Sequence, residues 1–215
     1  MYIPAAFEVQ DANRLGRFMR DNSFATLITH SDQAGASASH VPVLYDAQPH
    51  PGVLVGHLAR ANPQWRQLQN GREALVIFLG PHAYVSPRWY STEPSVPTWN
   101  YAAVHAYGIP KVIMDEASLA GLVRRMIRVY EGEGEGAWPG DLPPGYLSRQ
   151  LKAIVGFEIG ITRLEGKFKL GQNRSKSDIA GVYAALSQSA QPTERSLAEF
   201  MKLEGLLHDD QDQTK

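Results

Sequence analysis

The 215-residue chain is 43% hydrophobic, enough for one substantial core, and its formal net charge of −1 provides no overall positive field that would attract nucleic acid. The absence of cysteine excludes disulfides, thiolate metal sites and cysteine nucleophiles, and it fits a reducing cytoplasm. No run of about eighteen apolar residues and no signal-peptide pattern occurs, so a cytoplasmic protein without membrane contact is expected.

In the first part of the chain the pattern changes from helical to β. Asp11 is a typical N-cap residue, and apolar residues recur at helical spacing over 12–19. The runs 24–30 and 36–46 then alternate as strands do, with turn-forming residues between them. A helix followed by a β-hairpin is therefore predicted.

A strand that leads into a helix is expected next. The apolar run 52–60 predicts a third strand, and Asn62 followed by Pro63 is a strong signal for the start of a short helix. Residues 73–80 predict a further buried strand. The stretch 86–99 carries several prolines and aromatic residues, so it predicts a stiff loop.

The second half of the chain contains the clearest helical pattern. Residues 100–115 resemble strand material interrupted at Gly108-Ile109-Pro110, and apolar residues then recur on one helical face from 119 to 130. After a Gly- and Glu-rich connector, the sequence predicts a strand over 157–164, a basic loop over 166–178 and helices over 177–186 and 193–207.

These elements favour one fold class. Many short strands with regular turn signals and peripheral helices predict a β-barrel or sandwich of the α+β class. A doubly wound sheet is not expected, because strands and helices do not alternate and no Gly-rich phosphate loop is present.

The first candidate site is Ser39-His40-Val41-Pro42, in the second predicted strand. Proline interrupts a β-ladder and leaves a neighbouring carbonyl without its usual partner, which a ligand with hydrogen-bonding edges could use. The alternative is an edge strand with a surface histidine.

The second candidate is the segment from Gly56 to Trp65. Alternation places His57 and Ala59 on one face, and Arg60 lies at the strand end beside a helix start capped by Asn62. A phosphate is favoured in such a place, and small Ala59 allows a flat ring to approach. The alternative is a solvated Arg60 and an Asn62 that only caps the helix.

Two further stretches are weaker candidates. Trp99, Asn100 and Tyr101, with His105, could line a planar ligand, or they could pack in the core or in a dimer interface. The segment 167–176 has four positive charges and no acidic residue, which suits a phosphate contact or a nucleic-acid patch, or a solvated loop. The histidines have no zinc-ligand spacing, so no metal site is predicted, and no G-x-S-x-G elbow supports hydrolysis.

Six blocks in order give the chain a family resemblance. They are MYIPAAF, SHVPVLYD, GHLARANPQW, AYVSPRWY, VPTWNYAAVHAYG and KFKLGQNRSKSD. From Met1 to about Leu186 the chain resembles the PaiB family of negative transcriptional regulators. The resemblance implies an α+β, mainly antiparallel FMN-binding split β-barrel like that of pyridoxamine-phosphate oxidases. It also implies peripheral helices, a domain over residues 1–186 and a C-terminal helical tail over 187–215.

The resemblance also implies a cofactor, FMN, held in a homodimer with the flavin at the subunit interface. Carried onto this sequence, Ser39, His40, Val41 and Pro42 would line the isoalloxazine. His57, Ala59, Arg60 and Asn62 would hold the phosphate and ribityl chain, and Trp99, Asn100 and Tyr101 would complete the pocket. Arg174 and Lys176 are assigned to the flavin of the partner subunit.

Several functions stay open on the sequence. The resemblance implies a flavin-binding regulator, which contacts DNA or the transcription machinery. An FMN-dependent oxidoreductase is the alternative, because the flavin itself carries redox chemistry. Direct repression through the segment 167–176 is disfavoured by the net charge. A haem-binding protein, with His57 or His105 as axial ligand, is a further alternative.

Overall fold

The computed structural model of the chain describes residues 1–132, 134–140 and 142–207. The strands are β1 (Glu8–Val9), β2 (Phe24–Ser31), β3 (Gly35–Asp46), β4 (Val53–Ala59), β5 (Ala74–Val85), β6 (Thr98–Ile113) and β7 (Ile154–Lys169). The α-helices are α1 (Ala12–Asp21), α2 (Glu116–Glu131), α3 (Pro144–Leu151), α4 (Lys176–Ser187) and α5 (Pro192–Leu203). Short 3₁₀-helices are η1 (Ala5–Phe7), η2 (Pro63–Gln69) and η3 (Pro87–Trp89).

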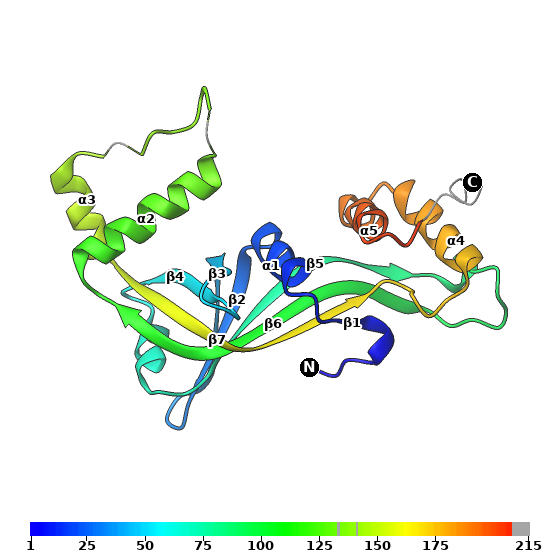
Figure 1. Ribbon diagram of the computed structural model, residues 1–215, viewed down its shortest axis with the longest axis horizontal. Helices are drawn as coiled ribbons and strands as arrows, with labels where there is room; N and C mark the ends of the chain where they lie inside the picture. The colour runs from blue at the N-terminus through cyan, green and yellow to red at the C-terminus, as the bar shows by residue number, and fades with distance from the viewer. Residues whose placement is uncertain (133, 141, 208–215) are drawn as a thin grey trace. The chain divides into compact units, whose positions relative to one another are not determined.

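The strands of the described part form one sheet in the order β1-β7-β4-β3-β2-β5-β6 (Figure 1). An additional pairing between β6 and β7 joins the sheet into a ring. Each pairing of known register is antiparallel. The α+β class and the mainly antiparallel barrel predicted from the sequence are thereby confirmed.

The chain divides into two compact units. The hairpin unit comprises Asp11–Phe78 and Val104–Leu164, and the C-terminal unit comprises Met1–Gln10, Leu79–Ala103 and Glu165–Lys215. Residues 208–215 of the latter lie outside the described part. The predicted boundary between residues 186 and 187 stays a prediction.

The hairpin unit begins with the predicted helix and hairpin. The Asp11 carboxylate accepts the Arg14 N–H at 2.7 Å and so caps α1, whose apolar residues are buried. Strands β2 and β3 pair from Phe24 opposite Pro42 to Ser31 opposite Gly35. The interior holds fully buried apolar side chains, among them Leu27, Leu54, Phe78, Phe157 and Ile159.

Helices α2 and α3 lie side by side in the same unit (Figure 1). Helix α2 is the helix expected after residue 115, and it buries Leu122 and Met126 against Leu44 of β3 and Val55 of β4. Helix α3 was not predicted, because the Pro- and Gly-rich stretch before it resembles a connector. Residues 133 and 141 of that connector lie outside the described residues.

One predicted interruption is wrong. Gly108-Ile109-Pro110 lies inside the continuous strand β6. A Cβ on Gly108 would lie 2.2 Å from the carbonyl oxygen of Gly160 in β7, so the glycine permits a close approach of two backbones rather than a break. Proline is tolerated because its fixed φ suits extended backbone.

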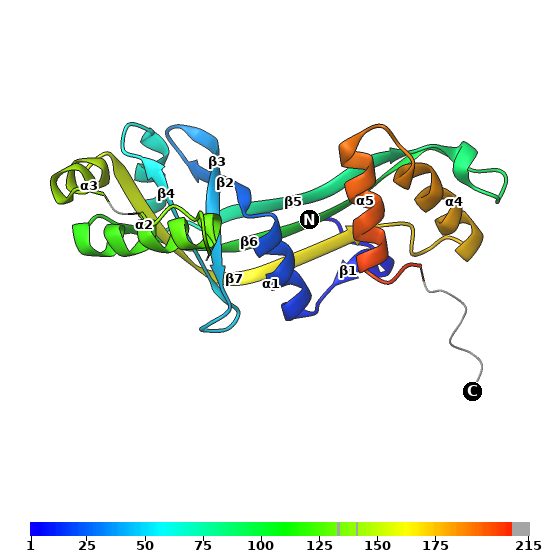
Figure 2. The ribbon, with the colours of Figure 1, turned by 90° about the horizontal axis from the view of Figure 1, so that it is seen from above.

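The C-terminal unit contains the two predicted terminal helices, α4 and α5, which lie side by side (Figure 2). Phe200 of α5 meets Phe168 of β7 edge to face, with ring centroids 5.3 Å apart. The prediction that the whole segment 166–178 is a loop is wrong, because β7 continues to Lys169. Nowhere in the described chain is a helix both long and apolar enough to cross a membrane.

Candidate functional site

The residues predicted to hold a cofactor fall into two sets. The hairpin unit contains Ser39, His40, Val41, Pro42, His57, Ala59, Arg60 and Asn62. The C-terminal unit contains Trp99, Asn100, Tyr101, Arg174 and Lys176. Each set therefore lies within one of the two units.

Alternation along β3 divides the first predicted motif between two faces. Ser39 and Val41 lie on one face, where Val41 is buried, whereas His40 is exposed and shares the other face with Pro42. The Thr26 hydroxyl lies 3.0 Å from His40 Nδ1, and the ring of Phe24, which is 71% exposed, lies 6.4 Å from the imidazole. An exposed aromatic ring, an imidazole and a hydroxyl thus form a surface on which a planar ligand can stack.

In β4, His57 and Ala59 differ in exposure. Ala59 is exposed and leaves room beside the strand. His57 lies opposite Gly156, where a Cβ would come within 3.0 Å of Leu119 in α2, so this part of the sheet face is closely covered. Its Nδ1 is buried and has no hydrogen-bond partner within residues 1–132, 134–140 and 142–207. Burial lowers the pKa of His57 below its ordinary value.

The lowered pKa of His57 predicts a loss of stability on mild acidification. Below about pH 6.5 the unfolded chain binds a proton at His57 that the folded chain does not, so the free energy of unfolding falls as pH falls. Replacing His57 with glutamine should flatten this dependence. Thermal melts of both proteins between about pH 5 and pH 8 measure the effect. Equal slopes in the two proteins would contradict a buried neutral His57.

Arg60 holds neighbouring backbone in place. Its Nε donates to the carbonyl oxygen of Lys152 at 2.7 Å, and its Nη2 donates to that of Ile154 at 2.9 Å. The guanidinium group thus joins the end of β4 to the segment between α3 and β7. Nη1 donates no hydrogen bond inside the described chain and can serve a ligand.

Asn62 has a capping role and a second role. Its Oδ1 accepts the Gln64 N–H at 3.0 Å, which confirms it as the cap of a short helix, although η2 is a 3₁₀-helix. Its Nδ2 donates to Ser39 Oγ at 2.9 Å. The side chain therefore links the two predicted motifs of the hairpin unit.

Two glutamines of η2, Gln64 and Gln67, carry no sequence signal of their own but hold the strands beside them. Gln64 is 3% exposed, and its amide donates to Leu27 O at 3.0 Å and to Ser37 O at 3.1 Å, while its Oε1 accepts the Ser39 hydroxyl. Gln67 accepts the Thr29 hydroxyl at 2.7 Å. Only the N-cap signal at Asn62 marked this region, because a glutamine carries no motif of its own.

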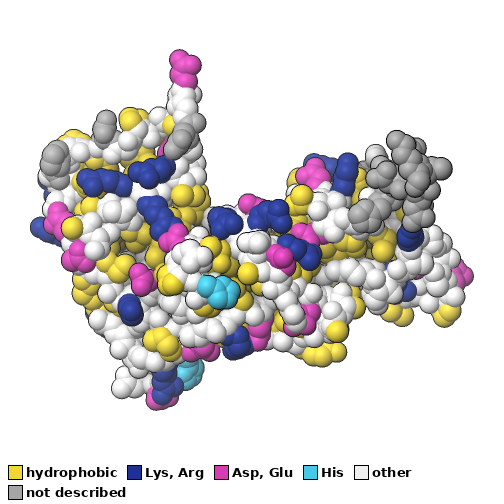
Figure 3. Space-filling model, in the orientation of Figure 1, with side chains coloured by type: hydrophobic (Ala, Val, Ile, Leu, Met, Phe, Trp, Pro, Cys, Tyr) yellow, Lys and Arg dark blue, Asp and Glu magenta, His cyan; other side chains and the backbone are white. Residues whose placement is uncertain are grey.

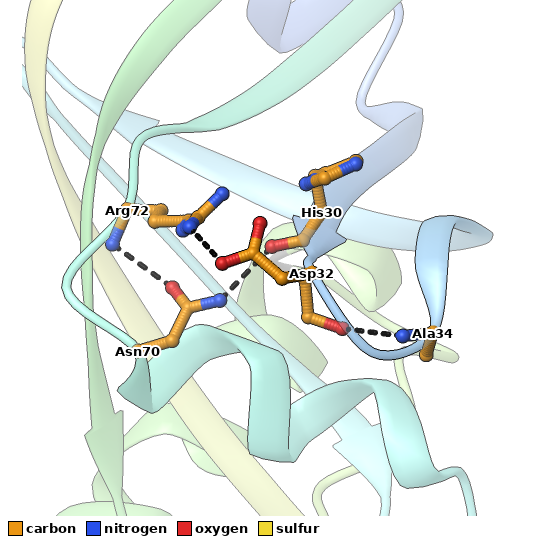
Figure 4. Close-up of polar contacts among 6 residues, drawn as sticks. His30, Asp32, Ala34, Asn70 and Arg72 are labelled. Atoms are coloured by element: carbon orange, nitrogen blue, oxygen red, sulfur yellow. Dashed lines mark hydrogen bonds and ion pairs between the residues drawn. The ribbon is translucent and has the colours of Figure 1, made fainter.

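A pocket of about 410 Å³ lies beside these groups, within the usual size range of ligand sites. Its walls include Ser37, Ser39, Asn62, Gln64, Arg66 and Gln67. At the C-terminal end of η2, Asn70 Nδ2 donates to His30 O at 2.9 Å and Arg72 pairs with Asp32 (Figure 4). Hydroxyl and amide groups with one cation suit a ligand that has polar edges and an anionic end.

In the C-terminal unit, the predicted Trp-Asn-Tyr motif is mixed in exposure. Trp99 is 54% exposed and lies edge-on to Tyr84, with ring centroids 6.3 Å apart, so it is not a core residue. Tyr101 is half-buried, and Asn100 is buried beside Arg174 in a small pocket. The Arg174 guanidinium lies 4.4 Å from the centroid of the Tyr90 ring. Lys176 is exposed at the start of α4.

A basic surface that sequence analysis did not single out lies on α2. Basic side chains gather over this helix (Figure 3), which contributes Arg124, Arg125 and Arg128. Arg124 and Arg128 line a pocket of about 510 Å³ together with Trp138, whereas Arg125 pairs with Asp46. Among the described residues no three His, Asp or Glu side chains are grouped to hold a metal.

Comparison with known families gives a match over residues 1–163 to the family described as "Putative FMN-binding domain". The Bacillus subtilis "Protease synthase and sporulation protein PAI 2" is 38% identical over 203 residues, covering 94% of this chain and 97% of that protein. An uncharacterized protein of Aspergillus fumigatus is 30% identical, covering 97% of this chain and 99% of the relative.

Two solved structures are similar in fold. The flavocytochrome Anf3 from Azotobacter vinelandii has a TM-score of 0.61 at 13% identity, covering 77% of this chain and 70% of that chain. A protein described as a putative 5-nitroimidazole antibiotic resistance protein, from Bacteroides thetaiotaomicron, has a TM-score of 0.56 at 11% identity, covering 74% and 85%. With the family match, they confirm the predicted split-barrel fold.

Proposed function

Because the chain belongs to the PaiB-like family described as "Putative FMN-binding domain", we propose that it binds FMN through its hairpin unit. The observation that carries the proposal is the polar pocket at η2, in which Asn62 and Ser39 meet. Its size and its hydroxyl and amide groups fit the hydroxyls and the hydrogen-bonding ring edge of such a ligand.

Each part of FMN has matching groups in the hairpin unit. Exposed His40 and Phe24, with exposed Ala59, offer a surface for the flat ring system. Nη1 of Arg60 is assigned to the phosphate, because an arginine N–H forms a strong hydrogen bond to an anion. Ser39 and Asn62 are assigned to the ribityl hydroxyls and the adjoining ring edge.

Bound FMN supplies electron-transfer chemistry that no side chain provides. The chain's own residues bind and orient the ring and exclude water from the face that they cover. His40 Nδ1 lies 3.0 Å from the Thr26 hydroxyl, so the two groups can act together at a ring edge. No further step is assigned to the protein.

A homodimer is part of the proposal. In the hairpin unit Phe24 is 71% and Ile109 44% exposed, and in the C-terminal unit Leu79 is 53% and Trp99 54% exposed. Exposed large apolar side chains of this kind are typical of surfaces that a second subunit covers. We assign Trp99, Asn100, Tyr101, Arg174 and Lys176 to the flavin site of the partner copy.

A regulatory role is proposed from the sequence resemblance and from the name of the 38% identical relative, "Protease synthase and sporulation protein PAI 2". Direct duplex binding through residues 167–176 is not part of the proposal. Lys167 is 8% exposed and donates to Tyr2 O at 3.0 Å, so it is poorly placed to neutralise DNA phosphates. We propose instead that the protein regulates transcription by contact with the transcription machinery.

The first test is the absorption spectrum of the purified protein, followed by titration of the cofactor-free protein with FMN and, separately, with haemin. We expect flavin bands and uptake of one FMN per chain. A Soret band with haemin and no FMN uptake would replace the proposal by the haem alternative. If FMN binds, oxidation of a nicotinamide donor distinguishes an oxidoreductase from a regulator.

A further inference from the structure

A second, smaller pocket lies wholly in the C-terminal unit. Its volume is about 200 Å³, and its walls include Thr98, Asn100, Lys169, Gly171, Asn173 and Arg174. The residues come from β6, the end of β7 and the turn before α4. A space of this size accommodates one small polar group rather than a ring system.

The pocket has two positive charges, which belong to Lys169 and Arg174. Lys169 Nζ donates to Thr98 Oγ1 at 2.6 Å and to Trp99 O at 2.5 Å, which leaves one of its three protons for another acceptor. Arg174 is held by stacking on Tyr90. Neither cation forms an ion pair with an acidic side chain in the part of the chain that the structure describes.

A third cation increases the local positive charge. Lys167 lies two residues from Lys169 in β7 and therefore on the same face, where its Nζ is 5.3 Å from the centroid of the Tyr101 ring. Burial, and then the charges of Lys167 and Arg174, lower the pKa of Lys169. Cations held together in this way repel one another, and a bound anion would remove the repulsion.

Asn100 gives an independent indication of a ligand. Its side chain is 97% buried, as its 3% exposure shows, and it lines the pocket. Its amide makes no hydrogen bond to other side chains or to the backbone among residues 1–132, 134–140 and 142–207. The amide is not one of the fully buried side-chain atoms of the described residues that lack a partner, such as His57 Nδ1, so it keeps some access to the pocket, where it can donate a hydrogen bond to a ligand oxygen.

We propose that this pocket binds the phosphate group of a ligand, with Lys169 and Arg174 supplying charge and Asn100 and Thr98 supplying hydrogen bonds. A tetrahedral dianion suits a lysine, an arginine fork and an amide that converge from three segments. Two ligands carry this chemistry: FMN bound in the partner copy, which rests on the proposed function, and a separate phosphomonoester, which does not.

The test is inorganic phosphate titrated into cofactor-free, full-length protein at constant ionic strength set with chloride. Binding to the folded state raises the midpoint of thermal unfolding by mass action, and ³¹P line broadening reports it directly. We expect stabilisation by phosphate beyond that by chloride. Equal effects of the two anions on the wild type would overturn the proposal.

Two variants locate the effect. Lys169→Gln should weaken phosphate binding about tenfold or more, the scale of one hydrogen bond to a charged group. Asn100→Asp keeps the side-chain shape but places a carboxylate beside the cations, so it should abolish phosphate binding and keep the protein folded. Lys202→Gln, on exposed α5, is the matched control and should bind as the wild type does. Phosphate affinity unchanged in Asn100→Asp would exclude this pocket.

The source of the phosphate is found by repeating the titration on FMN-loaded protein. If the FMN-loaded protein no longer binds inorganic phosphate, the flavin phosphate occupies the pocket. In that case Lys169→Gln should also lower the affinity for FMN more than the affinity for riboflavin, which lacks the phosphate. A site that persists after loading identifies a separate phosphomonoester. If the protein binds no FMN at all, the proposed function fails. The phosphate titration of the cofactor-free protein still shows whether this pocket binds phosphate.

Discussion

Arg60→Ala will weaken FMN binding by about 1.5–3 kcal/mol, which is roughly 10- to 150-fold in Kd, because a hydrogen bond to a charged group is lost. The same change will lower thermal stability. Arg60 also donates to the carbonyl oxygens of Lys152 and Ile154, and both acceptors would lose their partner. Fluorescence quenching of FMN on titration and a melting curve measure the two effects.

Riboflavin separates the two effects, because it lacks the phosphate. If Arg60 binds the phosphate, the affinity for FMN falls in Arg60→Ala and that for riboflavin stays nearly constant. Arg66→Ala is the matched variant within the η2 pocket, since Arg66 makes no contact with Lys152 or Ile154 but stacks on Trp65 at 5.0 Å. A larger loss of FMN affinity in Arg66→Ala than in Arg60→Ala would show that Arg66, in the η2 pocket, binds the phosphate instead of Arg60.

Gly181→Ala will destabilise the protein by about 1–3 kcal/mol, although alanine favours a helix more than glycine does. A Cβ on Gly181 in α4 would lie 2.2 Å from the carbonyl oxygen of Trp89, and a backbone atom cannot move aside as a side-chain tip can. The loop that begins with η3 would be displaced, and Tyr90 with it. Urea unfolding with an unchanged m-value measures the loss.

Gly121→Ala is the control for this prediction. Gly121 lies in the exposed part of α2, and nothing stands within 4 Å of the position of its Cβ. The substitution should therefore stabilise the protein by about 0.5–1 kcal/mol through helix propensity alone. If both alanine variants gain stability, the close packing of α4 on the η3 loop is wrong.

Local patterns predicted the hairpin unit well because its signals are short-range. The Asp11 cap, the turn between β2 and β3 and the Asn62-Pro63 start each depend on a few neighbouring residues. The interruption expected at Gly108 was wrong for a long-range reason. The residue that requires the glycine, Gly160, is far away in sequence, and only the strand pairing brings it near.

The candidate site was predicted in outline and not in detail. Arg60 was identified, but its contacts with Lys152 and Ile154 depend on tertiary structure. The alternation of side chains along β3 correctly places His40 and Val41 on opposite faces. It does not indicate that the Gln64 side chain accepts a hydrogen bond from the Ser39 hydroxyl. No periodicity can predict such a pairing, because the amide and the hydroxyl come from different elements.

The pocket of the C-terminal unit shows the same limit. The charge run predicted an anion contact, but it did not identify Asn100 as its neighbour, because about seventy residues separate Asn100 from Lys169. Lys167 in the same run is directed to Tyr2 and Tyr101. A charge pattern therefore indicates the kind of ligand, and the strand register determines which of the charges meet it.

The division into two units has a consequence for how this protein can be rearranged. The chain passes between the hairpin unit and the C-terminal unit four times, and three of these crossings fall inside the continuous strands β5, β6 and β7. Neither unit is a contiguous piece of the gene. Recombination at one or two points of the gene therefore cannot exchange one unit without the other. The η2 pocket and the phosphate pocket are thus inherited together.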